Sequence, residues 1–229
     1  MRGKSNQTLC NRRNYTNWPE FLIQVIINQA IWIKESYYIW SNMNQTRAII
    51  VSLLIVGIGS RLIPHYPNFT AIGAISLFGA AFGTRRSIAI VIPYLVMLFS
   101  DMILNNVIYA NMYPEDYKSF IFLYRGALWS YAAFGIIVIF GYTLFRNGVD
   151  LSKVIFGALG SSIIFFLLSN FGVWAATGAY SVNFTGLLAC YTAGLPFLIN
   201  QVFGDLFYSL VLFGVALHVF QLKPKRLLA

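Results

Sequence analysis

Residues 153–177, KVIFGALGSSIIFFLLSNFGVWAAT, contain a single charged side chain, that of Lys153 at the first position. A helix needs about 20 mainly apolar residues to cross the hydrocarbon core of a bilayer, so this stretch is long enough to span it. The other stretches of similar character are 47–63, 69–83, 87–106, 119–145 and 187–221. The sequence therefore predicts an all-α polytopic membrane protein with about six transmembrane helices.

The composition of the whole chain agrees with a lipid environment. Of its 229 residues, 58% are hydrophobic and only 10% are charged, whereas a soluble domain carries roughly 25% charged residues. So few charges cannot cover the surface of a water-soluble domain, and the lipid bilayer is the expected surrounding. The two cysteines, Cys10 and Cys190, lie far apart in the sequence, which excludes a disulfide framework and a cysteine metal cluster.

Two of the six stretches depart from an ordinary span. Stretch 69–83 is short and rich in glycine and alanine, which predicts a tilted, partly buried or incomplete crossing. Stretch 187–221 is too long for one straight crossing, and Pro196 is expected to kink it or to separate an entry segment from the span. Small residues let helix backbones approach closely in lipid and favour a compact bundle. They are Gly57, Gly59, Gly73, Ala74, Gly79, Ala80, Ala81, Gly157 and Gly160.

The basic residues predict the orientation. Cytoplasmic loops of membrane proteins carry an excess of lysine and arginine. If residue 47 is cytoplasmic, Lys118 is the basic residue of the outer loops, and Glu115 and Asp116 offset it. The inner segments then carry Arg47, Arg85, Arg86, Arg146, Lys153, Lys223, Lys225 and Arg226. Both ends of the bundle are therefore expected in the cytoplasm, and the net charge of +9 indicates membrane topology rather than a nucleic-acid partner.

Residues 1–42 form a separate polar and basic extension ahead of the bundle at 43–229. Its apolar part, 21–33, is too short to span a bilayer and suits an interfacial helix or a disordered segment. A third interpretation is that translation starts at Met43 and that the extension is not native.

Charged and amide side chains interrupt the apolar stretches at one level. Charged groups at membrane depth cost about 2.5–3.5 kcal/mol each on insertion scales and commonly have a function. The predicted topology places polar groups of five spans in the outer half, with Asp205 deeper. The candidate substrate-binding residues are Arg61, His65, Asn68, Asp101, Tyr124, Arg125, Asn170, Trp174 and Asn200.

Several interpretations of this polar layer stay open. It can be a ligand pocket that opens outward, or a set of ion pairs such as Asp101 with Arg61 or Arg125 that holds the bundle together. The long arginine side chains can also reach the interface. His65, after Pro64, suits a ligand contact or an interfacial side chain, and Trp174 also fits an aromatic belt.

Motifs typical of enzymes are missing from the sequence. It has no nucleophile elbow, no HExxH and no GxxxxGK[ST] phosphate loop. We therefore expect no enzymatic activity, no cofactor, no bound metal and no ATP hydrolysis by the chain itself.

Four runs carry a family resemblance: RLIPHYPNFTAIGAISLFGAAFG (61–83), VMLFSDMIL (96–104), SNFGVW (169–174) and GLLACYTAGLPFLINQVFGDLFYSLVLFG (186–214). They resemble a family of uncharacterised bacterial inner-membrane proteins. That family is similar to the S-components of energy-coupling-factor transporters, and within them to the solitary cobalamin transporters.

The resemblance implies a six-helix bundle in the inner membrane with an outward-facing site for a vitamin-like small molecule, such as a cobalamin. Without an ATP site of its own, a carrier of this type would need an energising partner such as an ATPase module, or would only facilitate diffusion. His65, Asp101 and Tyr124 occupy positions comparable to site residues of the cobalamin transporters. Stretch 107–123 lacks their cobalt-ligating cysteine, and Cys190 is interpreted as a packing residue, so thiolate ligation is not expected.

Three function classes follow. The first is uptake of a vitamin or small metabolite. The second is a non-transporting membrane subunit or assembly factor whose polar layer is structural or docks a protein. The third is an intramembrane enzyme that uses Asp101 and His65 as acid–base groups, although no nucleophile or metal set accompanies them.

Overall fold

The computed structural model describes residues 47–63, 66–83, 86–115, 117, 119–219 and 222, with the side chains of Arg86 and Val219 excepted. The chain divides into two compact units, 1–49 and 50–229. Residues 47–49 of the first unit are helical. The predictions for the extension 1–42, for Met43 and for His65 lie outside the described residues, and the following description concerns the second unit.

Helices make up the second unit, and its described residues contain no strand, which confirms the all-α prediction. The first helix runs through residue 62, and the last helix is followed by a π-helical turn, η2 (Val215–Val219). The helices between them are α2 (Ile72–Phe82), α3 (Arg86–Ile103), the π-helical η1 (Leu104–Ile108), α4 (Tyr109–Met112), α5 (Ala127–Leu144), α6 (Leu151–Ala176) and α7 (Phe184–Gly214).

Four of the described helices are long and apolar enough to cross a membrane: Ser87–Met112, Ala127–Leu144, Leu151–Ala176 and Phe184–His218. The length and apolar composition of these helices therefore identify the protein as a membrane protein. The second predicted crossing is realised as an 11-residue helix, α2. At 1.5 Å per residue α2 is about 16 Å long, roughly half the hydrocarbon thickness, so it does not make a full crossing.

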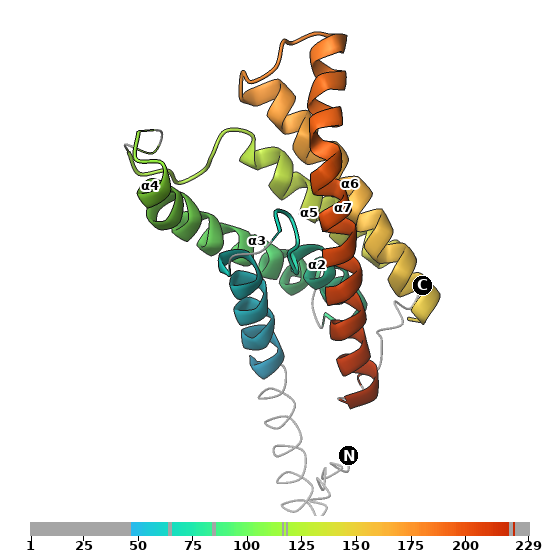
Figure 1. Ribbon diagram of the computed structural model, residues 1–229. Helices are drawn as coiled ribbons and strands as arrows, with labels where there is room; N and C mark the ends of the chain where they lie inside the picture. The colour runs from blue at the N-terminus through green and yellow to red at the C-terminus, as the bar shows by residue number, and fades with distance from the viewer. Residues whose placement is uncertain are drawn as a thin grey trace, which may run out of the picture. The chain divides into compact units, whose positions relative to one another are not determined.

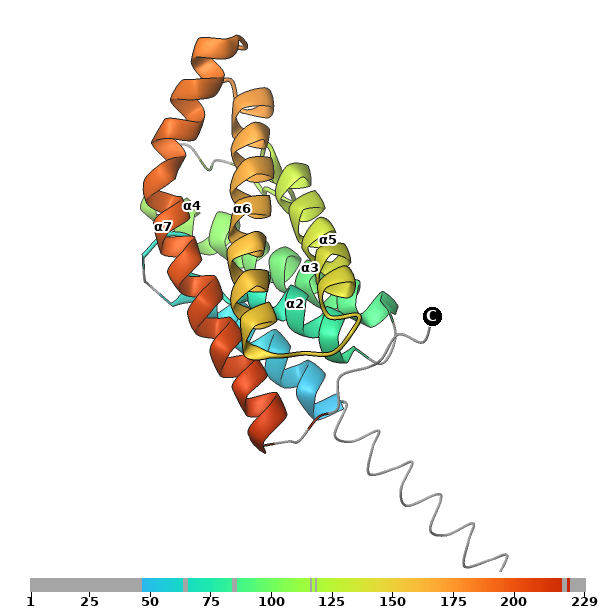
Figure 2. The same ribbon diagram turned by 90° about the vertical axis from the view of Figure 1, so that its right-hand side faces the viewer.

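The short helix α2 lies in the middle of the unit, packed against α3, α5, α6 and α7 (Figures 1 and 2). Its residues from Ile72 to Ala81 are all buried. Small residues permit this packing: a Cβ on Gly79 would lie 3.1 Å from the Ala89 Cα, and one on Gly141 would lie 2.7 Å from the Ala80 Cβ. Gly59 differs, because nothing lies within 4 Å of the place of its missing Cβ.

Helices α6 and α7 form an antiparallel pair, and each begins at a capping side chain (Figure 2). Asp150 Oδ1 accepts a hydrogen bond of 2.9 Å from the Lys153 amide, and Asn183 Oδ1 accepts one of 2.8 Å from the Gly186 amide. Such caps satisfy amides that have no partner in the first turn of a helix. The bond from the Lys153 backbone also lowers the pKa of the Asp150 carboxyl.

Two boundaries correct the sequence predictions. Helix α7 continues through Pro196, so the proline does not separate an entry segment from the span. Helix α5 begins at Ala127 instead of near residue 119, because Gly126 adopts a left-handed conformation with φ of 85°. Tyr124 and Arg125 therefore lie in the connection before the helix and not within the span.

Candidate functional site

A cavity of about 360 Å³ opens among α5, α6, α7 and the connections that precede or join them. Its lining combines amide, hydroxyl and guanidinium groups with aromatic rings. The lining residues are Pro67, Asn68, Tyr124, Arg125, Gly126, Ser130, Phe165, Ser169, Asn170, Val173, Tyr180, Cys190, Ala193, Gly194 and Phe197.

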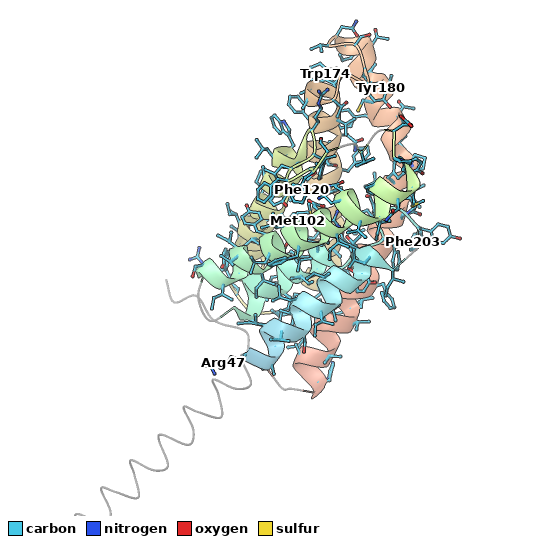
Figure 3. All side chains as sticks on the ribbon, turned by 90° about the vertical axis from the view of Figure 1, so that its left-hand side faces the viewer. Arg47, Met102, Phe120, Trp174, Tyr180 and Phe203 are labelled. Atoms are coloured by element: carbon cyan, nitrogen blue, oxygen red, sulfur yellow. The ribbon has the colours of Figure 1, made fainter. Side chains whose placement is uncertain are left out.

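Two helix faces form the wall between α6 and α7. Phe165 and Ser169 are four residues apart on α6, and Ala193 and Phe197 are four apart on α7, so each pair lies on one side of its helix. Figure 3 shows Trp174 and Tyr180 at the end of the unit where α6 leads into α7. Phe203 projects from the outer side of α7, away from the bundle, and is exposed.

The connection after the first helix is held against α7. The Phe69 ring packs against those of Phe207 and Tyr208 in tilted arrangements, with ring centroids 5.9 and 5.7 Å apart. Gly204 permits the approach, because a Cβ there would lie 3.0 Å from the Phe69 Cα. Asn68 takes a left-handed conformation with φ of 66°, which asparagine tolerates better than most residues. This turn places Asn68 at the cavity.

Arg125 brings a positive charge to the cavity. Its side chain is exposed, and no aspartate or glutamate of the described part of the chain forms an ion pair with it. The next residue, Gly126, fits closely against α6, since a Cβ on it would lie 3.2 Å from the Gly172 carbonyl oxygen. The turn that starts α5 thereby positions Arg125 at the cavity, where no carboxylate of the described residues pairs with its guanidinium.

Tyr124 and Ser130 close the side of the cavity near α5. The Tyr124 hydroxyl donates a 3.0 Å hydrogen bond to Ser130 Oγ across the start of the helix. Burial raises the pKa of the Tyr124 hydroxyl, and the nearby Asp101 charge adds to this effect. The phenol therefore stays protonated at neutral pH and acts as a hydrogen-bond donor.

Asn170 is oriented by both helices of the α6–α7 pair. Its side-chain amide nitrogen donates to the Phe166 carbonyl oxygen at 2.8 Å, and Cys190 Sγ of α7 donates to the backbone carbonyl oxygen of Asn170 at 3.3 Å. Gly194 leaves the space for the amide, because a Cβ there would lie 2.5 Å from Asn170 Oδ1. Cys190, interpreted from the sequence as a packing residue, is buried and also contributes to the cavity wall.

Arg61 and Asp101 form an ion pair beside the cavity rather than in its lining. Arg61 Nη1 lies 2.7 Å from Asp101 Oδ1 and donates to Ser100 Oγ at 2.7 Å. The Tyr131 hydroxyl donates to Asp101 Oδ2 at 3.3 Å. This is one of the ion pairs that the sequence allowed as an alternative to ligand binding.

The nine candidate residues therefore divide into groups. Asn68, Tyr124, Arg125 and Asn170 line the cavity, whereas Arg61 and Asp101 pair with each other. Trp174 Nε1 donates to the Ser181 carbonyl oxygen at 3.0 Å and so closes the α6–α7 connection. Asn200 is half-buried on α7 and does not line the cavity. The role of these residues in binding stays a prediction.

Sequence reasoning did not select several lining residues, because their types are common in any membrane helix. Phe165 and Phe197 look like lipid-facing aromatics, and Ser130 and Ser169 look like small packing residues. Tyr180 had one usable signal, its place in the connection between two predicted spans. No group of three or more histidine, cysteine, aspartate or glutamate side chains in the described ranges is arranged to hold a metal ion.

Comparison with known proteins places the chain in one family. No curated protein and no solved structure matches it. A family model matches residues 41–226, which is most of the chain and includes every residue that lines the cavity. The chain therefore belongs to DUF6580, a family of unknown function.

Proposed function

We propose that this membrane protein binds a small anionic metabolite in the cavity and takes it up in the manner of an S-component. The observation that carries the proposal is the guanidinium of Arg125 at a cavity of about 360 Å³, with which no carboxylate of the described residues pairs. A carboxylate or phosphate group would supply the missing negative charge and accept hydrogen bonds from the guanidinium.

The rest of the lining suits a ligand that is only partly polar. Asn68, Asn170 and the Tyr124 hydroxyl offer hydrogen bonds, and Phe165 and Phe197 offer apolar surface. Small-molecule sites combine a mainly apolar lining with a few placed polar groups, in volumes of about 300–1,000 Å³. The volume here lies at the lower end of that range, which favours a ligand of ordinary metabolite size over the large corrin ring of a cobalamin.

Uptake also needs a source of energy or a concentration gradient. The sequence has no phosphate-binding loop of its own, so we propose an energising ATPase module as the partner for accumulation. Without it, the bundle would equilibrate its ligand across the membrane. Under this proposal the cavity faces the outside of a bacterial inner membrane, as the distribution of basic residues predicts.

The test begins with the purified protein in detergent. Native mass spectrometry, followed by identification of the released molecules, should detect a small acid that co-purifies with the wild-type protein. Arg125→Gln should lose this ligand while it folds normally. Arg146→Gln is the matched control, because Arg146 is exposed after α5 and does not line the cavity. Equal ligand content in both variants would contradict the role of Arg125.

The same preparation distinguishes the alternative function. A non-transporting membrane subunit or assembly factor should co-purify with a larger complex and carry no small molecule. Its association should also be insensitive to Arg125→Gln. That combination of results would favour the assembly role over metabolite uptake.

A further inference from the structure

A second polar centre lies where α2, α6 and α7 meet. Its central group is Asp205 of α7, of which 2% is exposed. Ser162 Oγ lies 2.8 Å from Asp205 Oδ2, and the buried side chains of Ser161 and Gln201 also contact the carboxyl group. From the third side Gly73 of α2 approaches so closely that a Cβ on it would lie 2.2 Å from Asp205 Oδ1.

Asp205 has no cationic partner in the described part of the chain. Asp101 has nearly the same exposed fraction, but it forms the ion pair with Arg61. Helix α2 contains no titratable side chain. On α6 the charged side chain is Lys153, which pairs with Asp150 at 3.1 Å. Among the described residues, the polar side chains that contact Asp205 are the neutral ones of Ser161, Ser162 and Gln201.

The titratable groups on the same helix do not supply the missing charge. Helix α7 and η2 carry Cys190, Tyr191, Tyr208 and His218 besides Asp205. Cys190 Sγ and the Tyr191 hydroxyl donate to α6 carbonyl oxygens, and His218 lies about 20 Å along the helix from Asp205. An ionised carboxyl in this position would be a buried charge without compensation, which is strongly unfavourable.

The two contacts of Ser162 favour a protonated carboxyl group. Ser162 Oγ lies 3.1 Å from the Ala158 carbonyl oxygen as well as 2.8 Å from Asp205 Oδ2. The hydroxyl has one hydrogen, and the carbonyl oxygen can only accept. If Ser162 donates to Ala158, the hydrogen between Ser162 and Asp205 must come from the carboxyl group. A protonated carboxyl satisfies both contacts, whereas an ionised one satisfies only one.

The hydroxyl group of Ser161 lies next to the Asp205 carboxyl group and lacks a hydrogen-bond partner of good geometry among the described residues. Ser161 is fully buried next to the carboxyl group, yet its Oγ has no completed hydrogen bond. Buried polar atoms are nearly always satisfied in proteins, so an exception calls for an explanation. The two serines and the glutamine next to the carboxyl can offer hydrogen bonds to it in either protonation state. The Ser161 hydroxyl is close enough to complete such a bond when the carboxyl loses its hydrogen.

We propose that Asp205 is a proton-binding site of this membrane domain, occupied at neutral pH and able to exchange its proton with water. On the side of Oδ1 that faces Gly73, the close approach of α2 leaves no room for a large occupant, and a proton fits there. The site lies below the cavity on the same two helices, since Asp205 is eight residues, or about 12 Å, beyond the lining residue Phe197. The site does not depend on the identity of the ligand above it.

Infrared spectroscopy of the purified protein tests the site directly. The wild-type protein at neutral pH should show the carbonyl band of a protonated carboxyl group, and the band should shift after transfer of the folded protein to D₂O. Asp205→Asn should remove the band. Asp150→Asn, which changes an exposed carboxylate at a helix cap, should leave it in place.

Three results would overturn the proposal. The first is a wild-type spectrum without the band, or a band that Asp205→Asn does not remove. The second is a band that never shifts in D₂O, because the proton would then be a fixed structural element. The third is a thermal stability that sodium chloride, but not choline chloride, raises in the wild-type protein and not in Asp205→Asn, which would identify a metal cation as the occupant. If Asp205→Asn fails to fold, the absence of the band or of its D₂O shift in the wild-type protein would still contradict the proposal.

Discussion

Asp101 and Asp205 show how two equally buried carboxyl groups can be stabilised in different ways. Asp101 receives a guanidinium at 2.7 Å and the Tyr131 hydroxyl at 3.3 Å. Asp205 receives only neutral groups. Sequence position alone did not distinguish them, since both lie in apolar helices and each could have found an arginine or none. The distinction depends on which helices face each other.

The ion pair of Arg61 with Asp101 gives a first prediction. Arg61→Ala leaves Asp101 buried and unpaired, which should lower the free energy of unfolding by about 3–5 kcal/mol. The double variant Arg61→Met with Asp101→Leu removes both charges and should recover most of this loss. Denaturant unfolding in detergent, followed by circular dichroism, measures both. An equal loss in the single and double variants would show that the helix contact, and not the unpaired charge, is responsible.

Two glycines give a matched pair of substitutions. Gly73→Ala brings a Cβ to 2.2 Å from Asp205 Oδ1 and 2.5 Å from Ser161 Oγ, so either these side chains or α2 must shift. We expect a loss of about 1–3 kcal/mol, as for other overpacked sites. Gly59→Ala meets nothing within 4 Å and should stabilise its helix by up to about 1 kcal/mol. The same unfolding measurement compares the two, and equal effects would contradict the packing at Gly73.

At the scale of the helices, hydropathy predicted where the apolar segments lie. It did not predict whether a segment crosses the membrane or is buried in the bundle, nor where its helix begins. The stretch 153–177 differs from α6 by one or two residues at each end. The stretch 69–83 became a short buried helix, because its small residues let four other helices surround it. The start of α5 was misplaced because the apolar run 119–126 does not reveal the left-handed turn at Gly126. Apolar composition reports burial or lipid contact but not the backbone conformation.

The cap of α7 gives a prediction at this scale. Asn183→Ala removes the acceptor of the Gly186 amide and should destabilise the first turn of α7 by about 1 kcal/mol. Because Cys190 and Gly194 of the cavity wall follow within three turns, ligand affinity should fall with it. Hydrogen exchange of the amides near residue 186 measures the local effect. Asn183→Ser keeps an acceptor and should exchange as the wild-type protein does, and faster exchange in both variants would argue against the cap.

At the scale of the whole second unit, the cavity joins connections that are distant in the sequence. Asn68, Arg125 and Tyr180 come from the first, third and fifth connections, and all three line it. The sequence predicted these connections on one side of the membrane, because the basic residues gather in the other connections. Which residues of the polar layer face the cavity could not be anticipated, since Arg61 and Arg125 lie at similar predicted depth yet only Arg61 meets an aspartate.

The predicted orientation can be tested through the two ends of α6. Its 26 residues extend about 39 Å, more than the hydrocarbon thickness of about 30 Å, so residues before and after it should lie on opposite sides of the membrane. In a background with Cys10→Ser and Cys190→Ala, we expect Ala179→Cys to react with a membrane-impermeant maleimide in intact cells. Asn147→Cys should react only after the cells are permeabilised. Both positions are exposed.

The physical reason is the distribution of charge around α6. Arg146 and Lys153 flank its start, whereas residues 176–186 after it carry no charged side chain. Retention of lysine and arginine on the cytoplasmic side then fixes the direction of the helix. The reversed labelling pattern would show that the cavity opens to the cytoplasm, and the proposed uptake would become release or export. Labelling of both positions in intact cells would instead mean that α6 does not cross the membrane. We do not expect this result, because α6 is long and apolar and its exposure to water would be unfavourable.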